Sequence, residues 1–213
     1  MPHDRFSHVT EWVFDLDNTL YSREADVFGQ MDSLIVGYLE RELGLDTAAA
    51  DRMRESYFRD HGATVAGLVR NHGIDPDPFL EEVHDLDLSV LTPDPDLAEA
   101  IRALPGRKIV FTNGTREHAR RVTAARGLSG VFEALYGTED AHYTPKPEAG
   151  AFDHVFGKAR INGPRAAMFE DDPNNLRVPH ARGLRTVLVD GDDSGPHIDF
   201  RTHDLTGFLT QLV

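Results

Sequence analysis

Two aspartates stand where a β-prone segment of this sequence ends in a turn. The segment 8–15, HVTEWVFD, is largely apolar and ends on Asp15, and Asp17 follows two residues later. One carboxylate of such a pair can attack phosphorus, while the other protonates the leaving oxygen and then activates water. Both groups must flank the same phosphorus atom, and a tight turn can place them so. The competing interpretation is a simple turn in which Thr19 caps the next helix.

Two further segments carry groups that bind anionic oxygens. In VFTNGT, Thr112 offers a hydroxyl and Asn113 an amide, and the glycine that follows frees backbone N–H groups before a helix. Lys146 is one of only three lysines in the chain and stands between two prolines, which stiffen its backbone. Its ammonium could bind the nucleophile's carboxylate and the phosphate together. Either segment could also be an ordinary turn with no part in chemistry.

The acidic segment 168–176, MFEDDPNNL, could hold a metal ion. Mg²⁺ prefers octahedral oxygen ligands, tolerates few protein carboxylates and keeps several waters. Asp15, the backbone carbonyl of Asp17 and an acid from this segment could supply such a set. The ion would stabilise charge in a phosphoryl-transfer transition state. An acidic helix start, favoured by the helix dipole, is the competing interpretation.

Two other kinds of metal site are disfavoured. A calcium-binding loop could start at Asp15, but Leu20 stands where that loop requires glycine, and the preceding segment has a strand pattern. The pair His84–Asp85 could indicate an HD-type metal phosphohydrolase. The other histidines are scattered without the spacing of metal ligands, so this interpretation has little support.

The elements that must position these residues follow from the hydrophobic pattern. Strands alternate with helices after residue 92, with short connections between them. This alternation predicts parallel strands covered by helices on both faces, and ligands bind such sheets at the carboxyl ends of the strands. The four polar segments are expected at four such ends. Strands are expected at 8–15, 107–112, 132–137, 165–170 and 184–189, and helices at 115–127, 147–159, 174–183 and 204–212.

Residues 23–85 have a different pattern, in which apolar residues repeat every three or four positions. That period is typical of amphipathic helices. The turn-rich stretch LTPDPD at 91–96 then marks a boundary. We therefore predict a doubly wound, Rossmann-like α/β core formed by residues 1–20 and 93–213, with an all-helical insertion over 21–92.

The composition narrows the range of partners. The 213-residue chain is 40% apolar, carries a net charge of −14 and contains no cysteine. That charge disfavours nucleic acid, whose phosphates require Lys and Arg, and no apolar run approaches the ~20 residues that cross a bilayer. The first residues lack the basic and apolar regions of a secretory signal, so a cytoplasmic location is expected. We expect a monomer or homodimer that binds a small phosphorylated substrate, with neither nucleic acid nor membrane as a partner.

In their order along the chain, the four polar segments resemble the four motifs of the haloacid-dehalogenase-like (HAD) phosphohydrolases. Those motifs are an Asp-x-Asp-x-Thr turn, a Thr or Ser, a Lys, and a final acidic pair. The helical insertion is similar to the family's cap, so the resemblance covers nearly the whole chain. The matching residues are Asp15, Asp17, Thr19, Thr112, Lys146, Glu170 and Asp171.

The resemblance implies a role for each matching residue. Asp15 would be the nucleophile and Asp17 the general acid/base, whereas dehalogenases of the family lack this second carboxylate. Thr112 and Lys146 would bind the transferring phosphate, with Asn113 assisting.

The resemblance also implies Mg²⁺ as the cofactor. Asp15, Asp17 and Asp171 would hold the ion, and Asn175 would orient the acidic loop. The acidic segment offers three candidate ligands, because a different alignment of its EDD run with the family motif shifts the weight to another acid. These candidates are Glu170, Asp171 and Asp172.

Several segments are similar to the pyrimidine 5′-nucleotidase branch of the family, namely FDLDNTLY, TNGT, PKP, FEDDPNNL and VHDLDLS. This similarity implies hydrolysis of a pyrimidine nucleoside 5′-monophosphate. Three alternatives stay open: a phosphatase for another ester such as a sugar phosphate, a mutase with the same residues, and a non-catalytic nucleotide-binding protein. Candidates for lining the substrate cleft are Tyr21, Arg59, His61 and His84.

Overall fold

The computed structural model describes residues 2–213 and places a six-stranded, all-parallel sheet at the centre of the fold. The strand order is β3-β2-β1-β4-β5-β6, so the first strand lies in the middle of the sheet. The chain leaves β1 between two neighbours, and the ends of β2 and β4 therefore flank the end of β1. The strands are β1 (Glu11–Phe14), β2 (Arg107–Phe111), β3 (Ala134–Tyr136), β4 (Ala166–Glu170), β5 (Arg185–Val189) and β6 (Phe200–Thr202).

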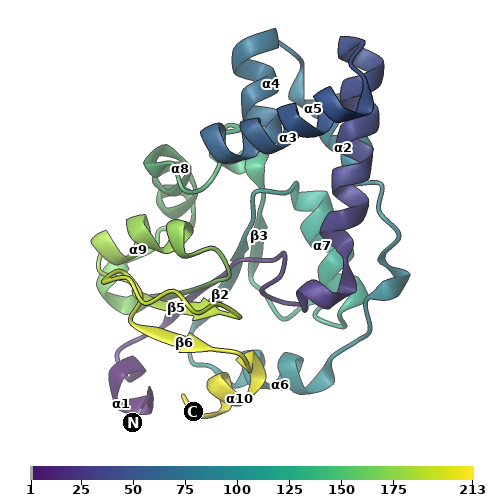
Figure 1. Ribbon diagram of the computed structural model, residues 1–213. Helices are drawn as coiled ribbons and strands as arrows, with labels where there is room; N and C mark the ends of the chain where they lie inside the picture. Colours follow the sequence, from purple (N-terminus) through teal and green to yellow (C-terminus); the bar gives the residue numbers. More distant parts are fainter. Residues whose placement is uncertain (1) are drawn as a thin grey trace.

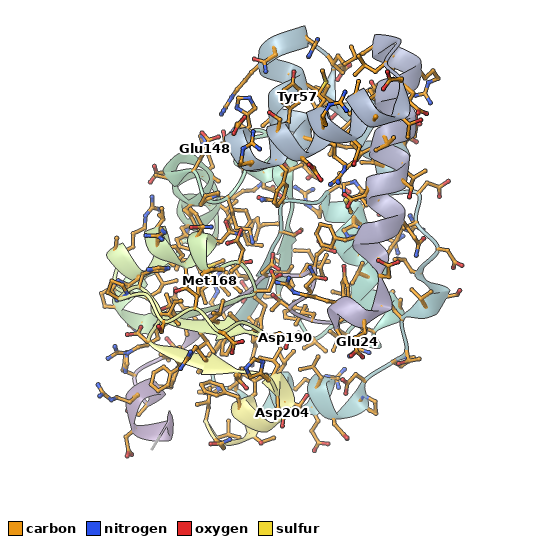
Figure 2. All side chains as sticks on the ribbon, viewed as in Figure 1. Glu24, Tyr57, Glu148, Met168, Asp190 and Asp204 are labelled. Atoms are coloured by element: carbon orange, nitrogen blue, oxygen red, sulfur yellow. The ribbon has the colours of Figure 1, made fainter. Side chains whose placement is uncertain are left out.

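Helices cover both faces of this sheet. Side chains alternate along a strand, so Trp12 and Phe14 of β1 enter one hydrophobic cluster and Val13 enters another. The first cluster is covered by α6 (Pro95–Ala103), α7 (Arg116–Ala125) and α10 (Leu205–Thr210). The second is covered by α8 (Ala149–Ala159) and α9 (Arg177–Ala181), and Figure 2 labels Met168 of β4 within it. The predicted doubly wound, Rossmann-like α/β core is confirmed.

An all-helical unit is inserted between β1 and β2. In Figure 1 this unit occupies the upper part of the molecule, away from both chain ends. Its helices pack around a hydrophobic cluster of their own, which includes Leu39, Leu68 and Phe79. We call this unit the helical cap: α2 (Val27–Leu43), α3 (Thr47–His61), α4 (Thr64–His72) and α5 (Pro76–Val83).

One arginine of α7's C-terminal end holds both chain segments that join the cap to the core. Arg126 donates through Nε to the carbonyl of Leu20, on the outgoing segment, at 3.0 Å. Its other nitrogens bond the Thr92 carbonyl and the Asp94 carboxylate, on the returning segment. The two connections therefore lie side by side.

Two elements were missed by the sequence analysis. The stretch LTPDPD does not only mark a boundary: Asp94 caps α6, and Pro95 occupies its first turn, where a missing N–H costs no helical hydrogen bond. The three-residue strand β6 lies at the edge of the sheet, where it pairs with β5 alone among the described strands, and it is too short to show a period. The expected helix 174–183 is a 3₁₀ turn, Pro173–Leu176, followed by α9.

A short helix, α1 (Pro2–Phe6), precedes β1, and Phe6 enters the cluster that contains Trp12. Among residues 2–213, no helix is both long and apolar enough to cross a membrane.

Neighbouring residues of α4 test the importance of the cap's own cluster. Leu68 is fully buried and Val69 is 36% exposed. Leu68→Ala should lower the free energy of unfolding by about 2–5 kcal/mol, because it leaves a cavity. Val69→Ala should change it by less than about 1 kcal/mol. Urea denaturation followed by circular dichroism measures both, and equal effects would contradict a cap built around Leu68.

Candidate active site

The end of β1 carries the two aspartates of the first motif. Asp15 follows Phe14 directly, and its backbone N–H extends the sheet pairing by donating to the carbonyl of Phe169 at 2.9 Å. Asp15 and Asp17 are both buried, with 5% and 8% of their surfaces exposed. Buried carboxylates are costly unless cations or hydrogen-bond donors meet them. The groups that meet these two therefore define the site.

A buried ammonium meets Asp15. Lys146 Nζ lies 2.6 Å from Asp15 Oδ1, 2.6 Å from Glu170 Oε2 and 3.2 Å from the Phe111 carbonyl. These partners belong to the ends of three adjacent strands, β1, β2 and β4. Burial alone would lower the pKa of Lys146, but attraction to Asp15 and Glu170 outweighs it and raises the pKa. The lysine is therefore a fixed cation.

Lys146 does not lie directly after a strand, contrary to the sequence prediction. The strand β3 ends at Tyr136, and the lysine follows on the loop before α8. Asn113 positions this loop: its Oδ1 accepts from the Lys146 N–H at 2.8 Å, and its Nδ2 donates to the Lys146 carbonyl at 3.1 Å. The Asn113 amide thus binds the lysine's backbone, and direct binding of phosphate by Asn113 stays a prediction.

Three carboxylates gather beside the lysine. Ligand oxygens of Asp15, Glu170 and Asp171 lie within 4.8 Å of one another. Burial raises the pKa of Asp15 to about 7, with Lys146 opposing the shift and Asp171 adding to it. Burial also raises the pKa of Glu170 well above its usual range, and that of Asp171. Lys146 and the Arg23 guanidinium, which lies 2.7 Å from Asp171, supply two positive charges for these three acids. The remaining negative charge and the all-oxygen set fit a hard divalent cation such as Mg²⁺.

The structure separates the three acids of the last motif. Glu170 binds Lys146, and Asp171 joins the carboxylate group. Asp172 instead accepts the Asn174 N–H at 2.9 Å, which caps the 3₁₀ turn Pro173–Leu176. Asn175, on that turn, is buried, and its Oδ1 has no hydrogen-bond partner among the described residues.

An arginine that the sequence analysis missed also contacts Asp171. Arg23 lies on a 3₁₀ turn, Arg23–Ala25, and its guanidinium is 2.7 Å from Asp171 Oδ2. The Asn18 amide approaches the same oxygen at 3.5 Å. Arg23 and Asp171 are 148 positions apart, so no local spacing could have paired them.

Asp17 is held by three donors from the core and the segment after β1. Tyr21 Oη and His118 Nε2 each donate to Oδ1 at 2.7 Å, and Thr112 Oγ1 donates to Oδ2 at 3.1 Å. Burial would raise the pKa of Asp17, but attraction and hydrogen bonding from His118, with the Tyr21 bond, lower it to about 2. Thr112 also accepts the Gly114 N–H at 2.9 Å, which fixes its hydroxyl.

A cavity of about 910 Å³ lies between the helical cap and α7. His118 lines it and also contacts Asp17, so one side chain separates the cavity from the residue expected to act as acid/base. Asp15, Asp17 and Lys146 are not among the lining residues. His84, a predicted cleft residue, lines it as well. Arg59 pairs with Asp60 on the cap surface and does not line it. His61, also predicted for the cleft, lies outside the lining too.

The lining of this cavity is acidic. It contains a single arginine, Arg121, whose guanidinium donates to the carbonyls of His84 and Leu86 at 2.7 Å each. Glu117 pairs with Arg120 of α7, and Glu82 pairs with Arg41 of the neighbouring helix α2. The other acids of the lining face few cations. The carboxylates are Asp77, Glu81, Glu82, Asp85, Glu117 and Glu139.

Comparison with known proteins agrees with this fold and site. Residues 13–183 match the model of the haloacid dehalogenase-like hydrolase family, so the chain belongs to that family and is a hydrolase. Phosphate metabolism protein 8 of Saccharomyces cerevisiae is 29% identical over 194 residues, which are 83% of this chain and 60% of that protein. The chain thus spans about 60% of the length of this relative.

Two solved structures share the fold. One is a HAD phosphatase from Thermococcus onnurineus, with a TM-score of 0.64, 18% identity, and 96% of this chain and 98% of that chain covered. The other is the HAD-hydrolase YfnB from Bacillus subtilis bound to magnesium, with a TM-score of 0.59, 15% identity, and 96% and 98% coverage.

The two neighbouring aspartates 171 and 172 provide a matched test of the metal site. Mg²⁺ at about 100 times its Kd should stabilise the folded protein by about 2.7 kcal/mol. Asp171→Asn should abolish this gain because it removes a ligand from the carboxylate group, whereas Asp172→Asn should keep it. Thermal unfolding with and without Mg²⁺ measures both. If only Asp172→Asn lost the stabilisation by Mg²⁺, the ligand would be Asp172 and the assignment to Asp171 would be wrong.

Proposed function

We propose that this hydrolase is a Mg²⁺-dependent phosphomonoesterase that acts through an aspartyl phosphate. The observation that carries the proposal is the placement of a second buried carboxylate, Asp17, two residues after the one that Lys146 binds. A phosphatase needs this second group to protonate the leaving oxygen and to activate water. The family resemblance, in which dehalogenases lack this carboxylate, supports the same reaction. The yeast relative's name, a phosphate metabolism protein, agrees with it.

The residues of the chain divide the reaction into two steps. Lys146 binds Oδ1 of Asp15, so Asp15 can attack phosphorus through Oδ2. Asp17 is ionised in the ligand-free site, and the negative charge of a bound phosphate dianion favours its protonation. A bond forms between Asp15 Oδ2 and phosphorus, the bond from phosphorus to the leaving oxygen breaks, and protonated Asp17 gives its proton to that oxygen. Asp17 then takes a proton from water as the water oxygen bonds to phosphorus and the bond from phosphorus to Asp15 Oδ2 breaks. Inorganic phosphate leaves, and Asp15 and protonated Asp17 are regenerated.

The phosphate group needs more positive charge than Lys146 supplies. Lys146 is already shared between Asp15 and Glu170, and the substrate adds a dianion to this group. Asp15, Asp171 and the backbone carbonyl of Asp17 would hold Mg²⁺, with Glu170 beside them. The ion would neutralise the charge that develops on the phosphoryl oxygens. Thr112 and Lys146 would bind the phosphate from the side of β2.

We propose a nucleoside 5′-monophosphate, with a pyrimidine base preferred, as the substrate. The similarity to the pyrimidine 5′-nucleotidase branch supports this choice, and the acidic cavity supports it independently. A volume of about 910 Å³ accommodates a nucleoside. The lining carboxylates repel a leaving group that carries a second phosphate or carboxylate, and a nucleoside carries neither.

The nucleophile is tested by a single substitution. Asp15→Asn should lower phosphate release from p-nitrophenyl phosphate by at least about 10³-fold, because the amide cannot form the acyl phosphate. Glu99→Gln, on the exposed surface of α6, should keep the wild-type rate. EDTA should abolish the wild-type rate and added Mg²⁺ restore it. Full activity of the Asp15 variant would exclude this mechanism.

The substrate class is tested by a phosphate-release screen. Uridine and cytidine 5′-monophosphates should have a kcat/KM at least about tenfold above that of 3-phosphoglycerate, since about 1.4 kcal/mol of repulsion gives this ratio. The double variant Glu81→Gln/Asp85→Asn should narrow the gap, and Glu99→Gln should not. A best substrate with two anionic groups would contradict the argument from charge, and an isomerised sugar phosphate without free phosphate would indicate a mutase.

A further inference from the structure

His118 is a buried histidine that the reaction steps above do not use. It lies in the first turn of α7, where its N–H donates to the capping hydroxyl of Thr115 at 3.0 Å, and its side chain is fully buried. Its Nε2 donates to Asp17 Oδ1 at 2.7 Å, while its Nδ1 has no hydrogen-bond partner among the described residues. A buried unpaired ring nitrogen is unfavourable, so the bond at Nε2 must offset that cost.

The ring of His118 is also fixed from the cap side. His84, at the end of α5, lies with its ring centroid 4.6 Å from that of His118. The His84 ring is itself held by the cap, because its Nδ1 donates to the Leu80 carbonyl at 2.7 Å. A contact path therefore runs from α5 of the cap through two imidazole rings to the Asp17 carboxylate.

The three donors around Asp17 fix the plane of its carboxylate. His118 and Tyr21 bind Oδ1, and Thr112 binds Oδ2. An acid/base group must meet the leaving oxygen and later the attacking water at hydrogen-bond distance, so its orientation decides the rate of proton transfer. Asp15 receives no contact from His118, and its own orientation depends on Lys146.

We propose that His118 is a positioning residue: its hydrogen bond orients the acid/base carboxylate of Asp17. The ring of His118 is itself held by its contact with His84 of the cap. The inference rests on the proposed phosphomonoesterase function. It separates the two ends of the site: Lys146 serves the nucleophile, and His118 serves the acid/base. Loss of the His118 hydrogen bond therefore impairs proton transfer to the leaving group and leaves nucleophilic attack intact.

Leaving-group dependence distinguishes this role from a merely structural one. The p-nitrophenolate ion leaves without a proton, whereas the alkoxide of a nucleoside 5′-monophosphate requires one. The quantity to compare is kcat/KM, because it covers the steps up to release of the alcohol and excludes hydrolysis of the aspartyl phosphate. The matched variants are His118→Gln, which retains a side-chain N–H donor near Nε2, and His118→Met, which has a similar size and no donor.

The expected losses differ between the two esters. His118→Met should lower kcat/KM for uridine 5′-monophosphate by about 10- to 100-fold, a part of the 10²–10⁴-fold that general acid catalysis contributes. For p-nitrophenyl phosphate it should lower kcat/KM by less than about threefold. His118→Gln should stay within about threefold of the wild type on both esters. Equal losses on both esters, or equal losses for Gln and Met, would overturn the proposal.

Two further measurements guard against misfolding and against failure of the underlying function. Thermal unfolding reports whether His118→Met folds, and Tyr21→Phe, which removes the other donor to the same oxygen, should show the same selective loss. In an Asp17→Asn background, His118→Met should cause no additional loss on the nucleotide, because the two residues act as one unit. Additive losses contradict the proposal. A wild-type enzyme that releases phosphate from neither ester would overturn the proposed function itself, and the inference with it.

Discussion

The site depends on a single buried ammonium, that of Lys146, between the carboxylates of Asp15 and Glu170. Without it, the ends of β1 and β4 would bring unpaired carboxylates together in a largely dry interior, at a cost of several kcal/mol. With it, the ends of the three central strands are tied at one point, since Phe111 of β2 also binds the same Nζ. The pair is incomplete, however, because Asp171 adds a further acid to the group. That residual negative charge makes the site suited to a divalent cation and, through it, to a phosphate dianion.

The lysine is in turn held in place by contacts from two directions. Asn113, directly after β2, binds its backbone N–H and carbonyl. The cap contacts the same loop: a Cβ on Gly62 would lie 2.9 Å from the Lys146 carbonyl, so the close approach requires glycine there. A cap-to-core ion pair, Arg70 with Glu148 at 2.6 Å, lies beside this contact, and Figure 2 labels Glu148 where α8 meets the cap. The position of the Lys146 ammonium is thus coupled to the position of the cap.

The sequence was enough to predict those site residues that directly follow a strand with a clear apolar pattern. Asp15 and Asp17 follow a strand with a clear apolar pattern, and the acids at 170 and 171 follow another, so their convergence could be inferred from the rule for parallel sheets. The contacts made by His118 and Arg23 could not be inferred, because each joins residues more than 100 positions apart without a shared pattern. Only the three-dimensional packing of α7 against the segment after β1 brings His118 to Asp17.

The hydrogen bonds of Arg126 have a consequence for how the core and the cap are joined. Both chain segments that join the cap to the core are hydrogen-bonded at the C-terminal end of α7, and His118 lies in the first turn of the same helix. Arg121 of α7 also donates to the carbonyls of His84 and Leu86 at 2.7 Å each, so the helix anchors the end of α5 as well. The placement of the cap and the surroundings of the Asp17 carboxylate therefore depend on this one helix.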